Sequence, residues 1–377
     1  MRTVYLDNAA TTKVDHQVIK VIQNSLAENF GNPSSSHKFG RKAKTAIESA
    51  RKSIAKSLHV SSSEIIFTSG GTEADNLVLF NAVLNLGVER IITSKIEHHA
   101  VLHTCEFIVK RHNIKLDFVN VTSQGSIDIQ HLESLLKDTT KKTLVSLMWI
   151  NNEIGNILDV DKVCQLCKVY NALLHSDTVQ VVGHYPIDLQ KTPIDFLVAS
   201  AHKFHGPKGV GFAYFKKGFG IQPLIYGGSQ EKGARASTEN VHAILGMETA
   251  LRNALVTLQK DKNYIESLKV YFISELKSLS DEIKFNGCSG DLDKSTYTIL
   301  NVRFPVNNNM LLFRLDLAGI AVSGGSACQS GSNIGSHVLR EFLEEKEKDK
   351  TSVRFSFSKY TTKEDVNYTI EQLKKLL

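Results

Sequence analysis

The sequence has few cysteines, no long apolar run and no block of like charge. Its five cysteines among 377 residues are an odd, sparse set, which argues against a secreted disulfide scaffold and favours a reducing compartment. No stretch of about 18 apolar residues occurs, so we expect no membrane-spanning helix. The N-terminal residues lack the apolar region of a signal peptide. We therefore expect a cytoplasmic protein.

The charge of the chain is mild for its length. The 45 Lys and Arg against 39 Asp and Glu give a formal net charge of +6, and the densest charged run, 344–350, alternates in sign. A nucleic-acid or membrane surface would need like charges gathered together. We expect no direct binding to nucleic acid and no role at a membrane.

The remaining composition, 42% apolar and 22% charged residues, is that of an ordinary globular protein. At about 150 residues per domain, the length predicts two domains. Strand and helix patterns alternate over the first two thirds, which predicts a mostly parallel sheet flanked by helices. Beyond residue 240 the pattern indicates a smaller α+β C-terminal lobe. We expect 1–14 to be an N-terminal segment of this small lobe, 15–255 the large domain and 256–377 the small C-terminal domain.

Hydrophobic periodicity predicts the individual elements. The expected helices cover 15–29, 37–58, a segment from about 73, 99–112, 128–137, 159–170, 240–280 and 362–377. The expected strands cover 64–68, 90–94, 115–119, 143–149, 173–176, 196–200, 296–302 and 352–355.

A lysine follows the end of one expected buried strand, 196–200. Lys203 lies between two histidines and ahead of a Gly-Pro turn, where α/β folds place ligands. Burial and nearby positive charge lower a lysine's pKa and make it a nucleophile toward aldehydes. A solvated surface lysine is the ordinary alternative for this segment taken alone.

Two other strand ends carry groups that would suit a phosphorylated, cationic ligand. The glycine turn before the helix near residue 73 offers Gly71 and Thr72, whose backbone N–H groups and hydroxyl suit a phosphate. An ordinary strand-to-helix loop is the alternative. Asp177 follows the strand 173–176 and would pair with a protonated pyridine nitrogen, or else cap a helix.

The remaining candidates are histidines and cysteines. His98 and His99 follow the strand 90–94. The side chains of adjacent residues point in different directions, so a stacking or acid/base imidazole fits better than a pair of metal ligands. Helix capping is the alternative. Cys164 and Cys167 form a CxxC pattern, but Cys167 falls on an apolar helical face and no second pair completes a zinc site. We therefore expect Cys167 to lie in the core, and we predict no metal site.

Several motifs, in order, resemble one known family. They are Tyr5-Leu6-Asp7-Asn8-Ala9-Ala10-Thr11-Thr12, Asn32-Pro33-Ser34-Ser35, Thr68-Ser69-Gly70-Gly71-Thr72-Glu73-Ala74-Asp75-Asn76, Asn151-Asn152-Glu153-Ile154-Gly155, His202-Lys203 and Gly324-Gly325-Ser326-Ala327-Cys328. Together they resemble the cysteine desulfurases of the NifS/IscS type, which are pyridoxal-phosphate (PLP) enzymes of the class V aminotransferase family with fold type I. The resemblance spans almost the whole chain.

The resemblance implies a role for each matching residue. Lys203 would hold PLP covalently, Asp177 would pair with its ring nitrogen, and Gln180 would bond its phenolic oxygen. His98 would stack on the ring and move protons. The phosphate would be held by Gly71, Thr72, Ser200 and His202, and by the partner subunit's Thr238 in a homodimer.

The resemblance also implies a substrate and a nucleophile. Asn152, which would touch both cofactor and substrate, and Arg354 would hold L-cysteine. The thiolate of Cys328, in the small and glycine-rich segment 323–332, would take the substrate sulfur as a persulfide and leave L-alanine. The sulfur would pass to an acceptor or scaffold protein for iron–sulfur cluster assembly or tRNA thiolation.

Other functions stay open. They are a related PLP enzyme such as a selenocysteine lyase or an aminotransferase, a divergent NifS-like paralogue of low activity, and a non-enzymatic binding module. Ser229, Ser237 and Ser358 stand where the family usually has glycine, which raises the second possibility. If such a position needs φ > 0, serine there costs on the order of 1 kcal/mol.

Overall fold

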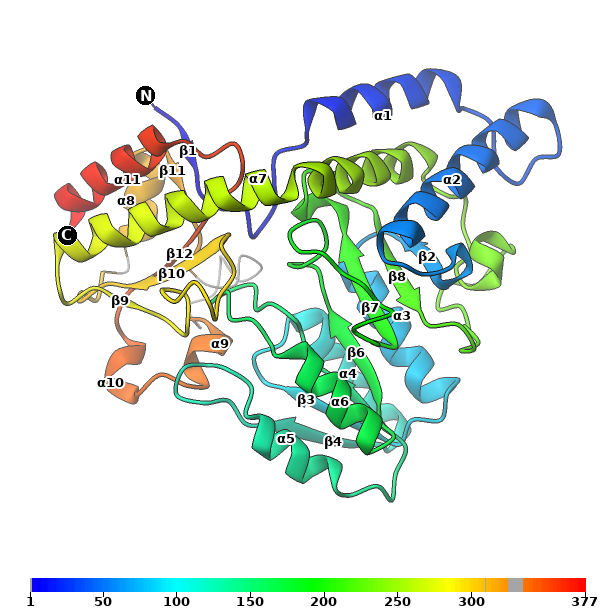
Figure 1. Cartoon of the computed structure of the whole chain (residues 1–377), viewed down its shortest axis with the longest axis horizontal. Coiled ribbons are helices and arrows are strands. Elements are labelled where there is room, and N and C mark those ends of the chain that lie inside the picture. Colours follow the sequence, from blue (N-terminus) through cyan, green and yellow to red (C-terminus); the bar gives the residue numbers. More distant parts are fainter. Residues whose placement is uncertain (1, 309, 325–334) are drawn as a thin grey trace.

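A seven-stranded sheet forms the centre of the larger part of the molecule (Figure 1). The computed structural model describes residues 2–308, 310–324 and 335–377. The strand order is β2-β8-β7-β6-β5-β3-β4. The strands are β2 (Ile65–Thr68), β3 (Arg90–Ser94), β4 (Lys115–Val119), β5 (Thr143–Ser146), β6 (Leu173–Asp177), β7 (Phe196–Ser200) and β8 (Gly211–Phe215).

The predicted mostly parallel sheet is confirmed. All neighbours from β7 to β4 pair in parallel, whereas β8 is antiparallel to both β7 and β2. The sequence did not predict β8. The expected strand 143–149 is shorter, Thr143–Ser146. The N–H groups of Leu147 and Trp149 still donate to His175 and Asp177, but the N–H of Met148 donates to a side chain, Glu97 Oε1, at 2.9 Å.

Helices cover both faces of this sheet. They are α1 (His16–Glu28), α2 (Lys38–Ser57), α3 (Gly71–Leu84), α4 (His99–His112), α5 (Ile129–Leu136) and α6 (Val160–Val169), with the short η1 (Ser62–Glu64), η2 (Ala201–Lys203) and η3 (Gln230–Gly233). Alternate strand residues face opposite sides. Ile92 packs in the core with α1, α2, α5 and α6, while its neighbour Ile91 packs with α3 and α4.

A second, smaller part has its own core. Its elements are β1 (Val4–Tyr5), β9 (Lys284–Phe285), β10 (Ile299–Arg303), α8 (Leu311–Leu317), β11 (Ile320–Ala321), α9 (His337–Arg340), α10 (Glu345–Lys348), β12 (Ser352–Ser356) and α11 (Lys363–Leu376). Of these, α9 lies outside that core and packs with Ile96 and Ile154, and α10 buries no residue. β12, β10 and β9 form a three-stranded sheet, and β1 pairs in parallel with β11. The N-terminal strand therefore joins elements from the C-terminal third.

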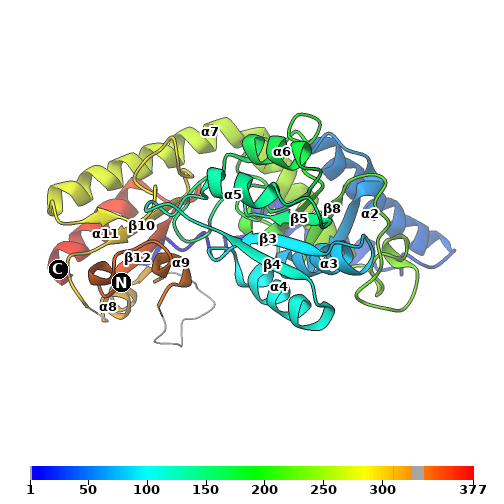
Figure 2. The same cartoon turned by 90° about the horizontal axis from the view of Figure 1, so that it is seen from below.

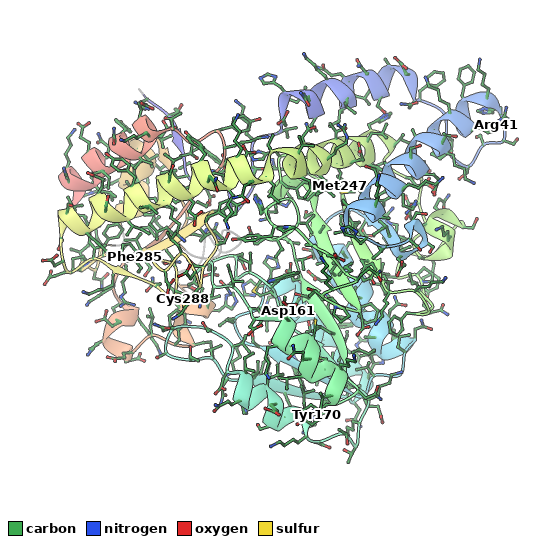
Figure 3. All side chains as sticks on the ribbon, viewed as in Figure 1. Arg41, Asp161, Tyr170, Met247, Phe285 and Cys288 are labelled. Carbon is green, nitrogen blue, oxygen red and sulfur yellow. The ribbon has the colours of Figure 1, made fainter. Side chains whose placement is uncertain are left out.

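One long helix, α7 (Val241–Leu279), connects the two parts (Figure 2). Met247 on its first half belongs to the large core, and Phe272 on its second half to the small core. Figure 3 shows the same separation, with Met247 near the large sheet and Phe285 in the small part. The expected boundary at residue 255 falls inside this continuous helix. No helix within the described ranges is both long and apolar enough to cross a membrane.

A buried ion pair fixes α2 against the edge strand β2. Both guanidinium Nη atoms of Arg51 donate to Glu231, at 2.6 and 2.7 Å, and the N–H of Phe67 donates to the same carboxylate at 2.9 Å. The guanidinium also lies 4.4 Å from the centre of the Phe67 ring. Removing one partner of such a buried pair leaves the other charge uncompensated.

We therefore expect Glu231→Gln to lower the free energy of unfolding by about 3 kcal/mol, measured by urea denaturation. Glu48→Gln is the matched control. Glu48 bonds the same Arg51 at 3.2 Å, but its side chain is 38% exposed, so its loss should cost less than about 1 kcal/mol. Equal losses in the two variants would contradict this account of the buried pair.

Candidate active site

The candidate site lies at the carboxyl edge of the large sheet. Asp177 ends β6 and Ser200 ends the neighbouring β7, so both stand at the edge where parallel strands present ligand-binding groups. Gly71 begins α3 beside them. A Cβ at Gly71 would lie 2.8 Å from Val179 Cγ2, so glycine allows the start of α3 to approach the turn after β6 closely.

Lys203 and Gln180 meet at the N-terminal segment. Lys203 Nζ donates to the carbonyls of Ala9 and Ala10 at 2.6 and 2.9 Å, and Gln180 Nε2 donates to Ala9 at 3.1 Å. His202 Nδ1 lies 3.2 Å from the hydroxyl of Thr11. The segment after β1 therefore lies against the sheet edge and contacts three of the predicted site residues.

Asp177 is a buried carboxylate with opposing influences on its pKa. It is 6% exposed, and its Oδ1 accepts from the N–H of Val179 at 2.9 Å. Burial raises the pKa of Asp177, while the bond from Val179 and the nearby Lys203 ammonium lower it. The charge of Asp177 acts in turn on two further buried acids, Asp75 and Glu97; burial above all, and with it the Asp177 carboxylate, raises the pKa of both.

Asp75 also has a buried histidine neighbour that sequence reasoning missed. His175 precedes Asp177 by two residues on β6, so both side chains point to the same face of the sheet. Its Nε2 lies 3.4 Å from Asp75 Oδ1, and its Nδ1 lies 2.9 Å from the hydroxyl of Ser146. Burial lowers the pKa of His175 to about 3, which keeps its imidazole neutral.

His98 caps helix α4, as the alternative interpretation of this residue predicts. Its Nδ1 accepts from the N–H of Ala100 at 3.1 Å. Burial first, and then the charge of Lys203, lowers the pKa of His98 to about 4, so this imidazole is neutral near pH 7. Its stacking on a cofactor ring stays a prediction. His99 stacks on His103 with ring centres 4.7 Å apart, but no three potential ligands within 2–308, 310–324 and 335–377 are arranged to hold a metal ion.

Three of the predicted phosphate ligands, Gly71, Thr72 and Ser200, lie at the start of α3. Ser200 is buried beside Gly70 and Gly71, whereas Thr72 is exposed on the first turn of α3. Thr238 lines a hollow of about 220 Å³ in its own chain, together with Ser69 and Arg235. Arg235 forms an ion pair with Glu73 there at 2.8 Å. The contribution of the partner subunit's Thr238 stays a prediction.

The predicted substrate residues do lie together. Arg354 on β12 donates from Nη1 to the carbonyl of Asn152 at 2.8 Å and from Nη2 to Asp7 Oδ1 at 3.0 Å. The same Asp7 oxygen accepts from the hydroxyl of Ser323 at 2.8 Å. Asp7 belongs to the first of the family motifs, but the sequence alone indicated no role for it. Cys328 lies outside the described residues.

The other four cysteines are free and buried: Cys105, Cys164, Cys167 and Cys288. Burial raises the pKa of the Cys164 thiol to about 12 and that of Cys105 and Cys167 further still, so these thiols stay protonated. The prediction that Cys167 belongs to the core is confirmed, since it is 3% exposed within the large apolar cluster.

The three serines that replace family glycines differ in backbone conformation. Ser237 has φ +93°, in the region that favours glycine, whereas Ser229 has φ −86°. Ser358 is not in the left-handed region either. Backbone strain, which the sequence suggested at three positions, therefore applies only to Ser237 among these three. Ser237 lines the hollow beside Thr238.

We expect Ser237→Gly to raise the free energy of unfolding by about 1 kcal/mol, because glycine adopts this φ without strain. Ser229→Gly is the control. It should not raise the free energy of unfolding, because glycine at this position only increases the conformational entropy of the unfolded chain. Urea denaturation of both variants measures the difference. A Ser237→Gly protein no more stable than Ser229→Gly would show that Ser237 is unstrained.

Comparison with known proteins gives one consistent result. The model of the family "Aminotransferase class-V" matches residues 4–369. The cysteine desulfurase IscS of Dictyoglomus turgidum is 42% identical, over 100% of this chain and 95% of that protein. A solved NifS-like protein is 36% identical, with TM-score 0.91, covering 100% of this chain and 99% of its own. A structure described as SspA in complex with cysteine is 29% identical, with TM-score 0.80, covering 96% and 100%. This chain belongs to the class-V aminotransferase family.

Proposed function

We propose that this protein is a cysteine desulfurase, which uses PLP to convert L-cysteine into L-alanine and takes the sulfur onto Cys328. The observation that carries the proposal is the meeting of Lys203, Asp177 and the start of α3 at one edge of the sheet. Full-length similarity to an IscS protein, and to a relative described as a cysteine complex, supports the substrate.

The residues present fit PLP in their chemistry. Lys203 supplies an amine for the aldehyde, and the buried Asp177 carboxylate suits a protonated pyridine nitrogen. No side chain of the described residues caps the N-terminus of α3, so its first N–H groups could bind a phosphate, with Ser200 beside Gly71. When bound, PLP supplies an electron sink that weakens the bonds at Cα and Cβ of the substrate.

The residues of the chain would carry the remaining steps. The guanidinium of Arg354 would hold the carboxylate of L-cysteine, and the neutral His98 would accept a proton near the cofactor. The Cys328 thiolate forms an S–S bond to the substrate sulfur as the Cβ–S bond breaks. The electron pair stays on carbon, and protonation there completes L-alanine.

The wider setting belongs to the same proposal. The chain would work in the cytoplasm as a homodimer, in which the partner subunit's Thr238 completes a phosphate site. Its large PLP-binding domain would span 15–255, and its small domain would combine 1–14 with 256–377. The persulfide would be passed to an acceptor or scaffold protein, for iron–sulfur cluster assembly or tRNA thiolation.

Incubation of the purified holoenzyme with L-cysteine should add about one sulfur atom to Cys328, reversible by reductant. Mass spectrometry of the Cys328 peptide measures it. Cys328→Ser should lose both the added sulfur and alanine formation, while Cys288→Ser should keep them because Cys288 is buried. An unmodified Cys328 beside normal cofactor content would contradict desulfuration. Retained cleavage of selenocysteine in Cys328→Ser would favour a selenocysteine lyase.

Borohydride reduction of the yellow holoenzyme should fix the cofactor on Lys203, found as one labelled peptide. Lys203→Ala should give no such adduct, because the amine that holds the aldehyde is gone. Lys208→Ala is the control from the same turn, since Lys208 is exposed, and it should label normally. Label at another lysine, or no cofactor at all in the wild-type protein, would refute the assignment.

A further inference from the structure

The buried guanidinium of Arg354 is held by a residue that the proposed mechanism does not use. Asp7 Oδ1 accepts from Arg354 Nη2 at 3.0 Å, and the side chain of Arg354 is only 2% exposed. Asp7 follows β1, so it comes from the opposite end of the chain. The backbones of Arg354 and Ser323 pair in both directions, at 2.7 and 3.3 Å, and the Ser323 hydroxyl fixes the same Asp7 oxygen.

The guanidinium keeps unused donors in this arrangement. Nη1 bonds the carbonyl of Asn152 at 2.8 Å and Nη2 bonds Asp7, while the buried Nε of Arg354 has no hydrogen-bond partner among the described residues. An arginine presents five N–H donors in one rigid plane. Asn152 and Asp7 engage the two Nη atoms, and the Nε–H remains as a donor that a planar anion such as a carboxylate could accept.

We propose that Asp7 is a positioning residue, which holds the Arg354 guanidinium in the orientation that binds the substrate carboxylate. This inference rests on the proposed function. Asp7 acts through Arg354 and does not itself touch substrate. Asp7 contributes mainly a hydrogen-bond acceptor at a fixed position. Its negative charge contributes less, because an anion beside the arginine does not help to attract the substrate carboxylate.

The position of Asp7 is itself well determined. The bridge between Asp7 and Ser356 ties the segment to β12, and Asn8 Nδ2 donates to the carbonyl of Ser356 at 2.8 Å. Ser356, two positions along β12 from Arg354, therefore fixes the backbone of Asp7, which is the partner of Arg354. A carboxylate held in this way fixes the guanidinium without the entropy cost of a free surface pair.

The test is the affinity of the holoenzyme for L-alanine, followed through the absorbance of the bound cofactor. Asp7→Ala should weaken L-alanine binding about tenfold, the loss expected for a charge-assisted hydrogen bond. Asp7→Asn keeps an oxygen at the same place and should bind within about twofold of wild type. Ethylamine, which is L-alanine without the carboxylate, should bind wild type and Asp7→Ala equally.

A double-mutant cycle decides whether the effect passes through Arg354. In an Arg354→Ala background, adding Asp7→Ala should cause no further loss of affinity. Asp15→Ala controls for a general loss of stability: Asp15 pairs with Lys359 at 2.8 Å and likewise joins the two ends of the chain. It should leave L-alanine affinity unchanged, even where urea denaturation shows a comparable loss of stability.

Three results would overturn the role of Asp7, and the first two concern L-alanine. They are an unchanged affinity for L-alanine in Asp7→Ala, and losses from Asp7→Ala and Arg354→Ala that simply add. Equal weakening of ethylamine would also overturn it, because a carboxylate-positioning residue cannot affect an amine that has no carboxylate. Failure of the proposed function is distinguishable, since the wild-type protein would then bind no cofactor, or its cofactor absorbance would not respond to L-alanine.

Discussion

The arrangement of the site depends on one short segment, residues 7–12, that hydrogen-bonds to both parts of the molecule. Ala9 accepts from Lys203 and Gln180 at the edge of the large sheet. Asp7 accepts from Arg354 on the small sheet. The amine of one part and the guanidinium of the other are thereby held relative to a common backbone. The parallel pairing of β1 with β11 anchors this segment, because Val4 and Leu6 on either side of Tyr5 are buried in the small core.

Burial of charge is the second constraint on this molecule. Away from the site, Arg51 and Glu231 neutralise each other within 2.6 Å. At the site, Asp177, Asp75 and Glu97 bring three acids into the interior, and Lys203 is a cation that acts on Asp177. Buried carboxylates remain uncharged unless a cation or several donors stabilise them. A cluster of this composition favours a cationic ligand at Asp177.

Much of the fold could be predicted from local pattern. The strands 90–94, 115–119 and 196–200 and the helix 99–112 were predicted to the residue, because apolar runs and helical periodicity are properties of the local sequence. Strand β8 was not predicted; one of its two partners, β2, lies more than a hundred residues earlier in the chain, so this pairing has no local signal. The expected strand 296–302 is observed as β10, Ile299–Arg303, where the bounds are set by pairing with β12.

For the site, the sequence by itself determined which side chains were candidates and the family to which they belong. Lys203 and Asp177 were identifiable because a strand end beside a turn is a local signal. The tertiary structure alone decided which of these groups meet. Asp7 and Arg354 are 347 positions apart, and nothing in the local pattern of either indicates the other. Likewise only the backbone dihedrals separate Ser237 from Ser229, because φ is imposed by the surrounding packing and the same residue type occupies both positions.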